Sequence, residues 1–215
     1  MKQRARSEAA KLEREEVILT AAETLLRQSG YGVLTMQSVA TASGLAKGTI
    51  YLYFSSRETL IHTVYGRLFD RWVLRFASDE YRPAEFDGFC KEFARYFLSD
   101  QLFVELSRSP WLFVDPKVDS IVHTKSRRAM ATRIKRLASL ACSCLKIEPT
   151  SAHQLIWGLL TAATGALVLT GPSATLTIVL RDDFRAHQKI IDFSSVFFNL
   201  VKPLQTSLKI NSCDH

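Results

Sequence analysis

The stretch GLAKGTIYLYF, from Gly44 to Phe54, decides the fold of this chain. Two glycines and a lysine stand directly before a run of apolar and aromatic residues. Such a stretch fits a loop that cradles phosphate, a buried turn, or the start of a short helix that reads DNA. A Walker A loop is excluded, because in GLAKGT the lysine precedes the glycine instead of following it. The surrounding residues decide among the other interpretations.

Apolar residues recur at helical spacing on both sides of this stretch. A stripe from Val17 to Leu26 predicts a first helix, which Gly30 would end. Thr35 can cap a short second helix with Val39 and Ala40 turned inward. The pair 43–44 breaks that helix, and a third short helix is predicted over about 47–54. Three helices in this order predict a helix-turn-helix with a supporting first helix.

In a helix-turn-helix the last short helix enters the major groove of DNA. Gly44 permits the turn, and Lys47 beside the free amides of the helix start suits a phosphate. Gly48 allows close approach to the DNA backbone, Thr49 is small and polar, and the Tyr51 hydroxyl can donate to phosphate.

The opposite side of this third helix is expected to hold it in place. Ile50, Tyr53 and Phe54 would turn mostly inward, against the first helix and the helix that follows. Ser55 and Glu58 are spaced as a capping box for that next helix.

Residues from about 15 to 65 resemble the DNA-binding region of the TetR family of bacterial transcriptional regulators. The resemblance rests on AAETLLRQSGYGVLTMQSVATASGLAKGTIYLYFSSRETL, residues 21–60. It departs from the common pattern at Gln37, where arginine is frequent, and at Leu52, where a polar or aromatic residue is frequent, so the operator sequence stays open. The resemblance implies that DNA is contacted by Thr35, Lys47, Thr49, Tyr51 and Arg57. Gln37 can still read an adenine edge or contact phosphate, and Gly48 allows close approach, so both are further DNA-binding candidates. A basic arm, residues 1–12, is expected either to enter a minor groove or to be disordered.

Composition is that of a folded soluble protein of one large or two small domains. The chain has 215 residues, 47% hydrophobic and 23% charged, with a net charge of +7 and a pI near 9.4. The basic balance favours anionic partners such as nucleic acid or a membrane surface. Four cysteines without zinc spacing and a start without an apolar run predict reduced thiols, no signal peptide and a cytoplasmic location.

The rest of the chain is also predicted to be helical, so we expect an all-α fold. It would comprise an N-terminal three-helix helix-turn-helix domain, residues 1–60, and a larger helical domain, residues 61–215. The apolar stretch 155–171 is shorter than a bilayer requires, which favours a buried helix and no membrane. Segment 174–181 stays open between strand and helix.

The family resemblance implies that the larger domain dimerises and holds a small-molecule effector in a pocket. For an apolar or amphipathic effector the candidate pocket residues are Phe89, Phe93, Tyr96, Phe97, Phe103, Trp111, Phe113, His123, His153 and Trp157. For a homodimer interface the candidates are Gly158, Ala162, Gly165, Ala166, Phe193, Phe197 and Leu200, although close packing within one subunit is the alternative for the small residues.

Three classes of function were weighed against these residues. A ligand-responsive regulator, expected to be a repressor released from a pseudo-palindromic double-stranded DNA operator, accounts for most of them; an activator of the same fold is the alternative. An enzyme lacks support, because the sequence contains neither G-x-S-x-G nor H-E-x-x-H. A membrane-surface or scaffold protein would use the basic charge and the apolar helix. No catalytic residue, metal or cofactor is expected.

Overall fold

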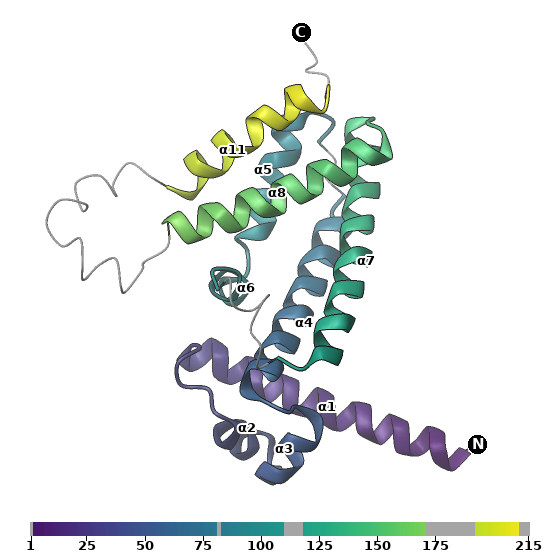
Figure 1. The fold of residues 1–215 in the computed structure, drawn as a ribbon, viewed down its shortest axis with the longest axis vertical. Helices are drawn as coiled ribbons and strands as arrows, with labels where there is room; N and C mark the ends of the chain where they lie inside the picture. The colour runs from purple at the N-terminus through teal and green to yellow at the C-terminus, as the bar shows by residue number, and fades with distance from the viewer. Residues whose placement is uncertain (1, 81–82, 110–117, 171–191, 211–215) are drawn as a thin grey trace, which may run out of the picture. The chain divides into compact units, whose positions relative to one another are not determined.

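The computed structural model describes residues 2–80, 83–109, 118–170 and 192–210, with only the backbone described for 2–7 (Figure 1). Throughout these ranges the regular structure is helical, which confirms the all-α prediction. Segment 174–181 lies outside these ranges. The helices are α1 (Lys2–Ser29), α2 (Met36–Ser43), α3 (Lys47–Tyr53), α4 (Arg57–Ser78), α5 (Phe86–Phe97), α6 (Gln101–Ser107), α7 (Ser120–Leu145), α8 (Pro149–Thr170) and α11 (Phe193–Ser207).

The chain forms two compact units. The first comprises Met1–Phe69 and Trp111–Arg128, and the second Asp70–Pro110 and Ala129–His215. The boundaries therefore fall inside α4 and α7, so these two helices contribute to both units. The division at residue 60 that the sequence suggests stays a prediction.

The first unit packs α1, α2, α3 and the start of α4 around one apolar core. Its fully buried side chains include Ile18, Ala22, Val39, Ile50, Leu60 and Ile61. The buried face of α1 is turned from the predicted one, because Leu19 is buried whereas Val17 is largely exposed. Val17 and Leu25 instead line an open groove of about 430 Å³ together with Ala42 and Ser43 of α2.

Local signals set the ends of the short helices. Thr35 Oγ1 accepts from Ser38 N at 3.0 Å and Ser38 Oγ accepts from Thr35 N at 2.9 Å, a capping box that confirms the predicted start of α2. Gly30 and Gly44 both have positive φ, 73° and 68°, as expected of residues that end helices. The cap of α4 was predicted wrongly: Ser56, not Ser55, accepts from Thr59 N at 3.0 Å.

The second unit is built around a cluster of aromatic rings. Trp72 of α4 lies 5.3 Å from Phe93 and 5.8 Å from Phe97, both of α5, between ring centroids. Phe103 of α6 lies 5.2 Å from Phe97, and Phe197 of α11 lies 6.3 Å from Phe93. All five side chains are buried, so helices distant in sequence share one apolar centre.

Helix α8 is the one among the described helices that is long and apolar enough to cross a bilayer, and half of its most apolar window is buried inside the protein. It lies beside α11 (Figure 1). Gly158 is the close contact, because a Cβ there would lie 2.5 Å from Leu204 Cδ1 of α11. The burial agrees with the prediction of a core helix.

Candidate nucleic-acid interface

Helix α3 separates the predicted contact residues from the residues that hold it in place. Ile50 is fully buried and Phe54 nearly so, whereas Lys47 and Gly48 are exposed. Tyr51 is 48% exposed. Thr49 and Tyr53 are half-buried, so Tyr53 faces inward less completely than expected. The exposed face of α3 therefore carries a cation, a glycine and a phenol on a firmly packed helix.

Leu52 gives this exposed face an apolar end. Its side chain is 82% exposed, although the sequence around it is otherwise used for packing. An exposed leucine contributes no burial energy to the fold. It can contact the methyl group of thymine in a major groove.

The start of α3 leaves backbone donors available to an anion. Its N-cap is Ala46, which has no side-chain oxygen and makes no side-chain cap hydrogen bond. The first amides of a helix have no acceptor within the helix. The Lys47 ammonium lies at the same helix end, so this end of α3 is suited to a phosphate.

Helix α2 adds two polar side chains to the same helix-turn-helix. Thr35 and Gln37 are both exposed, at its N-cap and in its first turn. The Thr35 hydroxyl serves the capping box, and its exposure leaves it accessible from solvent as well. Helices α2 and α3 pack on each other through the Gly44 turn (Figure 1).

Arg57 differs from the role that the resemblance implied. Its Nε donates to the carbonyl oxygen of Leu34 at 2.6 Å, and its Nη1 donates to the Tyr31 hydroxyl at 3.2 Å. Its Nη2 donates to the carbonyl oxygen of Tyr31. The guanidinium is therefore engaged by the loop between α1 and α2, and a contact of Arg57 with DNA stays a prediction. Sequence reasoning missed Tyr31, Leu34 and Ser38, of which only the position of Tyr31 in the family pattern gave a signal.

Among the described residues, the candidate effector residues fall into several groups. Phe89, Phe93, Phe97 and Phe103 are buried against one another and the rings around them. His123 lies in the first unit, 5.4 Å from His62 between ring centroids. His153 accepts from Trp157 Nε1 at 3.2 Å, and both side chains are exposed. Trp111 and Phe113 lie outside the described residues.

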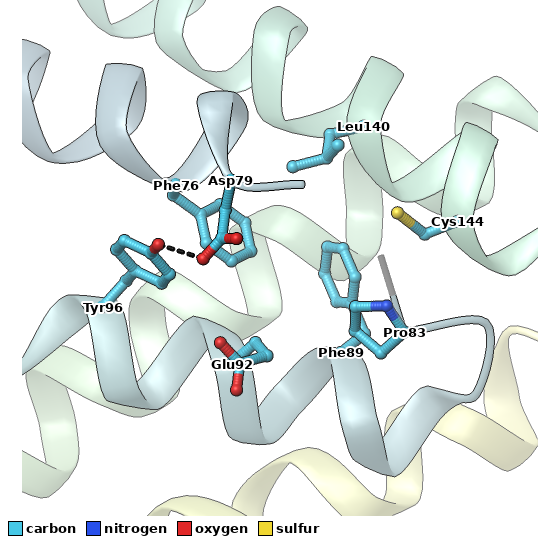
Figure 2. Close-up of a pocket in the computed structure, with 8 residues that line it drawn as sticks. All are labelled: Phe76, Asp79, Pro83, Phe89, Glu92, Tyr96, Leu140 and Cys144. Carbon is cyan, nitrogen blue, oxygen red and sulfur yellow. Dashed lines mark hydrogen bonds between the residues drawn. The ribbon is translucent and has the colours of Figure 1, made fainter. Parts of the chain in front are cut away.

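A small cavity opens at the edge of the aromatic cluster (Figure 2). Its volume is about 10 Å³, the size of a single water molecule. Of the candidates, only Phe89 and Tyr96 line it; the other lining residues are Phe76, Asp79, Pro83, Glu92, Leu140 and Cys144. The Tyr96 hydroxyl donates to Asp79. The cavity as it stands is too small for an effector.

Ionisable groups near this cavity are constrained by their neighbours. A hydrogen bond to Glu92 raises the pKa of Arg95, so this guanidinium stays charged. Burial, and then the negative charge of Asp87, raises the pKa of the Cys90 thiol to about 12. Cys90, Cys142 and Cys144 are free thiols, as expected; Cys213 lies outside the described residues.

Several dimer candidates face the interior of their own chain, which favours the alternative of close packing within one subunit for these residues; the interface itself stays a prediction. Ala162, Ala166 and Phe197 are buried within the second unit, and Gly158 packs on Leu204. Gly165 and Phe193 are half-buried, and Leu200 is 49% exposed. Of the small residues of α8, Gly158 thus serves the packing of this helix on α11.

Known proteins resemble the chain in two ways. The family model for bacterial regulatory proteins of the tetR family matches residues 18–64. The uncharacterized HTH-type transcriptional regulator YfiR of Bacillus subtilis is 39% identical over 51 residues, 24% of this chain and 25% of YfiR. The HTH-type transcriptional repressor KstR of Mycolicibacterium smegmatis is 37% identical over 62 residues, 29% of this chain and 30% of KstR. The matches thus span about a quarter to a third of these relatives.

The likeness in fold extends further than the likeness in sequence. FadR of Bacillus subtilis, solved in complex with stearoyl-CoA, aligns over 88% of this chain and 96% of its own, with a TM-score of 0.51 and 15% identity. At that identity the match supports the fold alone. Both relatives are named as HTH-type regulators of transcription, the class of function that the sequence suggested. Residues 18–64 therefore match the helix-turn-helix region of the tetR family of bacterial regulatory proteins, and the all-helical fold of the chain resembles that of the transcriptional regulator FadR.

Proposed function

We propose that this protein is a dimeric, ligand-responsive repressor that binds a pseudo-palindromic operator and is released from it by a small molecule. The observation that carries the proposal is the exposed face of α3, where Lys47, Gly48 and Tyr51 stand opposite the buried Ile50. The name of KstR supports repression over activation. Such a protein would act in the cytoplasm, where the DNA is.

Each residue of the face has a physical role in this proposal. Lys47 and the first amides of α3 bind a phosphate, and the Tyr51 hydroxyl donates to a second one. Gly48 lets the helix approach the DNA closely. Thr49 and Gln37 reach base edges or phosphate, and Leu52 packs on a thymine methyl. Thr35 adds its exposed hydroxyl at the start of α2.

The homodimer would use the outer faces of α8 and α11. Trp157 is 46% exposed on α8, and Thr161, Gly165 and Val168 follow it at helical spacing on the same side. Leu200 of α11 is similarly exposed. Large apolar side chains on one exposed stripe are typical of a protein interface. Two such pairs of helices would form a four-helix contact between subunits.

The effector is proposed to be apolar or amphipathic and to open the aromatic cluster. In this proposal the cavity of about 10 Å³ is the closed state of the effector site. Stearoyl-CoA bound to FadR of Bacillus subtilis is an amphipathic molecule held by a protein of similar fold. To release DNA appreciably, an effector must favour the open state by ~1–3 kcal/mol.

The first experiment measures fluorescence anisotropy on DNA selected from a random pool, over a range of salt concentrations. Lys47→Ala should weaken binding and flatten the log–log salt slope by ~0.9, because one phosphate contact is lost. Tyr51→Ala should weaken binding with a much smaller change of slope, because it removes no charge.

Lys91→Ala is the matched control, since Lys91 is an exposed lysine of α5 in the second unit. It should leave the affinity and slope near those of the wild type. If the wild type binds every sequence equally and weakly, the proposed function is wrong.

A further inference from the structure

We propose that Arg57 is a positioning residue that fastens the helix-turn-helix to the first turn of α4, and thereby sets the spacing of half-sites that a dimer accepts. The inference rests on the proposed function, since it assumes a dimer on DNA. It replaces the phosphate contact that the family resemblance implies at this position.

The guanidinium of Arg57 holds one loop with all three of its nitrogens. Two of them donate to Leu34 O at 2.6 Å and Tyr31 Oη at 3.2 Å, and the third donates to Tyr31 O. Its Cζ lies 4.2 Å from the centroid of the Tyr31 ring. The side chain is only 24% exposed. A planar guanidinium presents its donors as a rigid fork, so this set of contacts fixes direction as well as distance.

The loop that Arg57 holds is the entry to the helix-turn-helix. It begins after Gly30, which ends α1 with φ 73°, and Leu34 immediately precedes Thr35, the cap of α2. The turn from α2 to α3 is closed by a hydrogen bond from Leu45 N to Ala40 O at 3.1 Å. Holding Leu34 therefore holds the start of α2, and α3 follows α2 through a short closed turn.

The first turn of α4 is also fastened to the beginning of α7. Thr59 Oγ1 accepts from Asp119 N at 3.1 Å, and Thr59 is buried. One turn further on, the ring of His62 lies 5.4 Å from that of His123. Both α4 and α7 continue into the second unit. The reading helix is therefore tied by Arg57 to the segment from which both connecting helices start.

The contacts of Arg57 with the loop before α2 have a consequence for DNA recognition. Dimeric helix-turn-helix proteins bind half-sites one helical turn of DNA apart, or multiples of a turn, and the protein's geometry sets that spacing. If these contacts of Arg57 are lost, the reading helix of each subunit can change its orientation independently. The dimer would then lose affinity for its best operator and discriminate less against operators of altered spacing.

The deciding variant is Arg57→Lys, because it retains the positive charge and removes the fork. If Arg57 positions the helix-turn-helix, affinity for the selected operator should fall by about tenfold, as expected when hydrogen bonds to a charged group are lost. The preference for the selected operator over operators with one base pair more or fewer between half-sites should fall as well. The salt slope should stay unchanged. A phosphate contact would predict nearly wild-type affinity and spacing preference.

Two further variants separate positioning from general loss of structure. Arg75→Lys makes the same substitution at an exposed arginine of α4. It should change neither the operator affinity nor the preference for half-site spacing. Tyr31→Phe removes one acceptor of the Arg57 guanidinium and keeps the ring. It should weaken the spacing preference, but by less than Arg57→Lys does. Thermal unfolding checks that each variant is folded at the assay temperature.

Amide hydrogen exchange gives a reading that does not depend on DNA. In Arg57→Lys, exchange at the start of α2 should become faster than in the wild type, while exchange in the core of α1 should not. If exchange and spacing preference both match the wild type, the inference is overturned. The wild type could also bind no DNA selectively while Arg57→Lys still speeds exchange at the start of α2. The proposed function would then be wrong, but the positioning role of Arg57 would be supported.

Discussion

Gly44 shows how one residue without a side chain fixes the turn on which the DNA-reading helix depends. Its φ of 68° places it in the left-handed region, and its N–H bonds back to the end of α2. A Cβ at Gly44 would meet no atom within 4 Å, so only the backbone conformation demands glycine. Gly44→Ala should therefore lower the free energy of unfolding by about 1–2 kcal/mol, the cost of a left-handed alanine. Urea unfolding measures the change.

Gly48→Ala is the contrasting substitution for that experiment. Gly48 lies in α3, has no positive φ, and also has open space around its Cβ position. Alanine there should raise stability by about 0.5–1 kcal/mol, because glycine is the poorer helix former. It should nevertheless weaken DNA binding by bringing a methyl group to the exposed face. Equal effects of both alanines on stability would contradict the assignment of the turn.

Individual residues were predictable where their role is local. Thr35 and Gly44 act on backbone groups within a few positions, and cap and turn preferences identify them. Arg57 acts on Tyr31 and Leu34, 26 and 23 positions away. No local pattern contains that information, so the family position suggested a DNA contact instead.

Among the helices, those with local end signals were predicted best. Helices α2 and α3 begin at Met36 and Lys47, as the cap and turn residues indicated. Helix α1 was expected to follow an arm but is helical from Lys2. Its buried face also differs, because Leu19 packs inward and Val17 does not. Apolar residues surround much of this helix, so periodicity alone leaves the direction of its core undecided.

Helix α8 illustrates a second kind of ambiguity. The sequence shows small residues spaced four apart, which predicts a close helix neighbour but not whether that neighbour belongs to the same chain. In the structure Gly158 receives Leu204 of α11. Trp157, next to Gly158 in the chain, is 46% exposed instead.

The packing of α8 on α11 predicts the effect of adding one methyl group. In Gly158→Ala the new Cβ would lie 2.5 Å from Leu204 Cδ1, so the leucine must shift. Overpacking costs about 1–3 kcal/mol, and the better helix propensity of alanine returns up to ~1 kcal/mol. We expect a net loss of about 0.5–2 kcal/mol in the free energy of unfolding, measured by urea denaturation.

A double-mutant cycle tests the cause of that loss. Adding Gly158→Ala to a Leu204→Ala background should cost little or become favourable, because the clashing atoms are gone. If Gly158→Ala costs the same in both backgrounds, the contact with Leu204 is not responsible.

For the whole molecule, several of the aromatic candidates lie in one buried cluster, while their role in an effector pocket stays a prediction. Phe93, Phe97 and Phe103 do come together, around Trp72. Their rings fill the space between helices, and aromatic composition cannot distinguish a filled centre from a lined cavity. Asp79, which directly follows α4, and Glu92 of α5 line the remaining cavity from positions that carry no sequence signal. Binding of an effector would therefore have to move side chains of this cluster.

The exposed stripe on α8 yields a prediction about assembly. Thr161 lies on the exposed side of this helix, one turn after Trp157. Thr161→Arg would bring two unpaired charges into the proposed contact between subunits, which is strongly unfavourable in a buried interface. Light scattering after size exclusion should then show a monomer. Operator affinity should fall by about 100-fold or more, because the two half-sites are no longer bound by linked reading helices.

Ser139→Arg provides the matched control for assembly, since Ser139 is an exposed residue of α7. It adds the same charge and bulk outside the proposed interface, so the dimer and its operator affinity should persist. Circular dichroism should show the same helical content in both variants, which separates loss of assembly from loss of fold. A Thr161→Arg protein that keeps the mass of a dimer would place the interface elsewhere. A monomer that still binds the selected operator at wild-type affinity would show instead that one helix-turn-helix suffices for recognition.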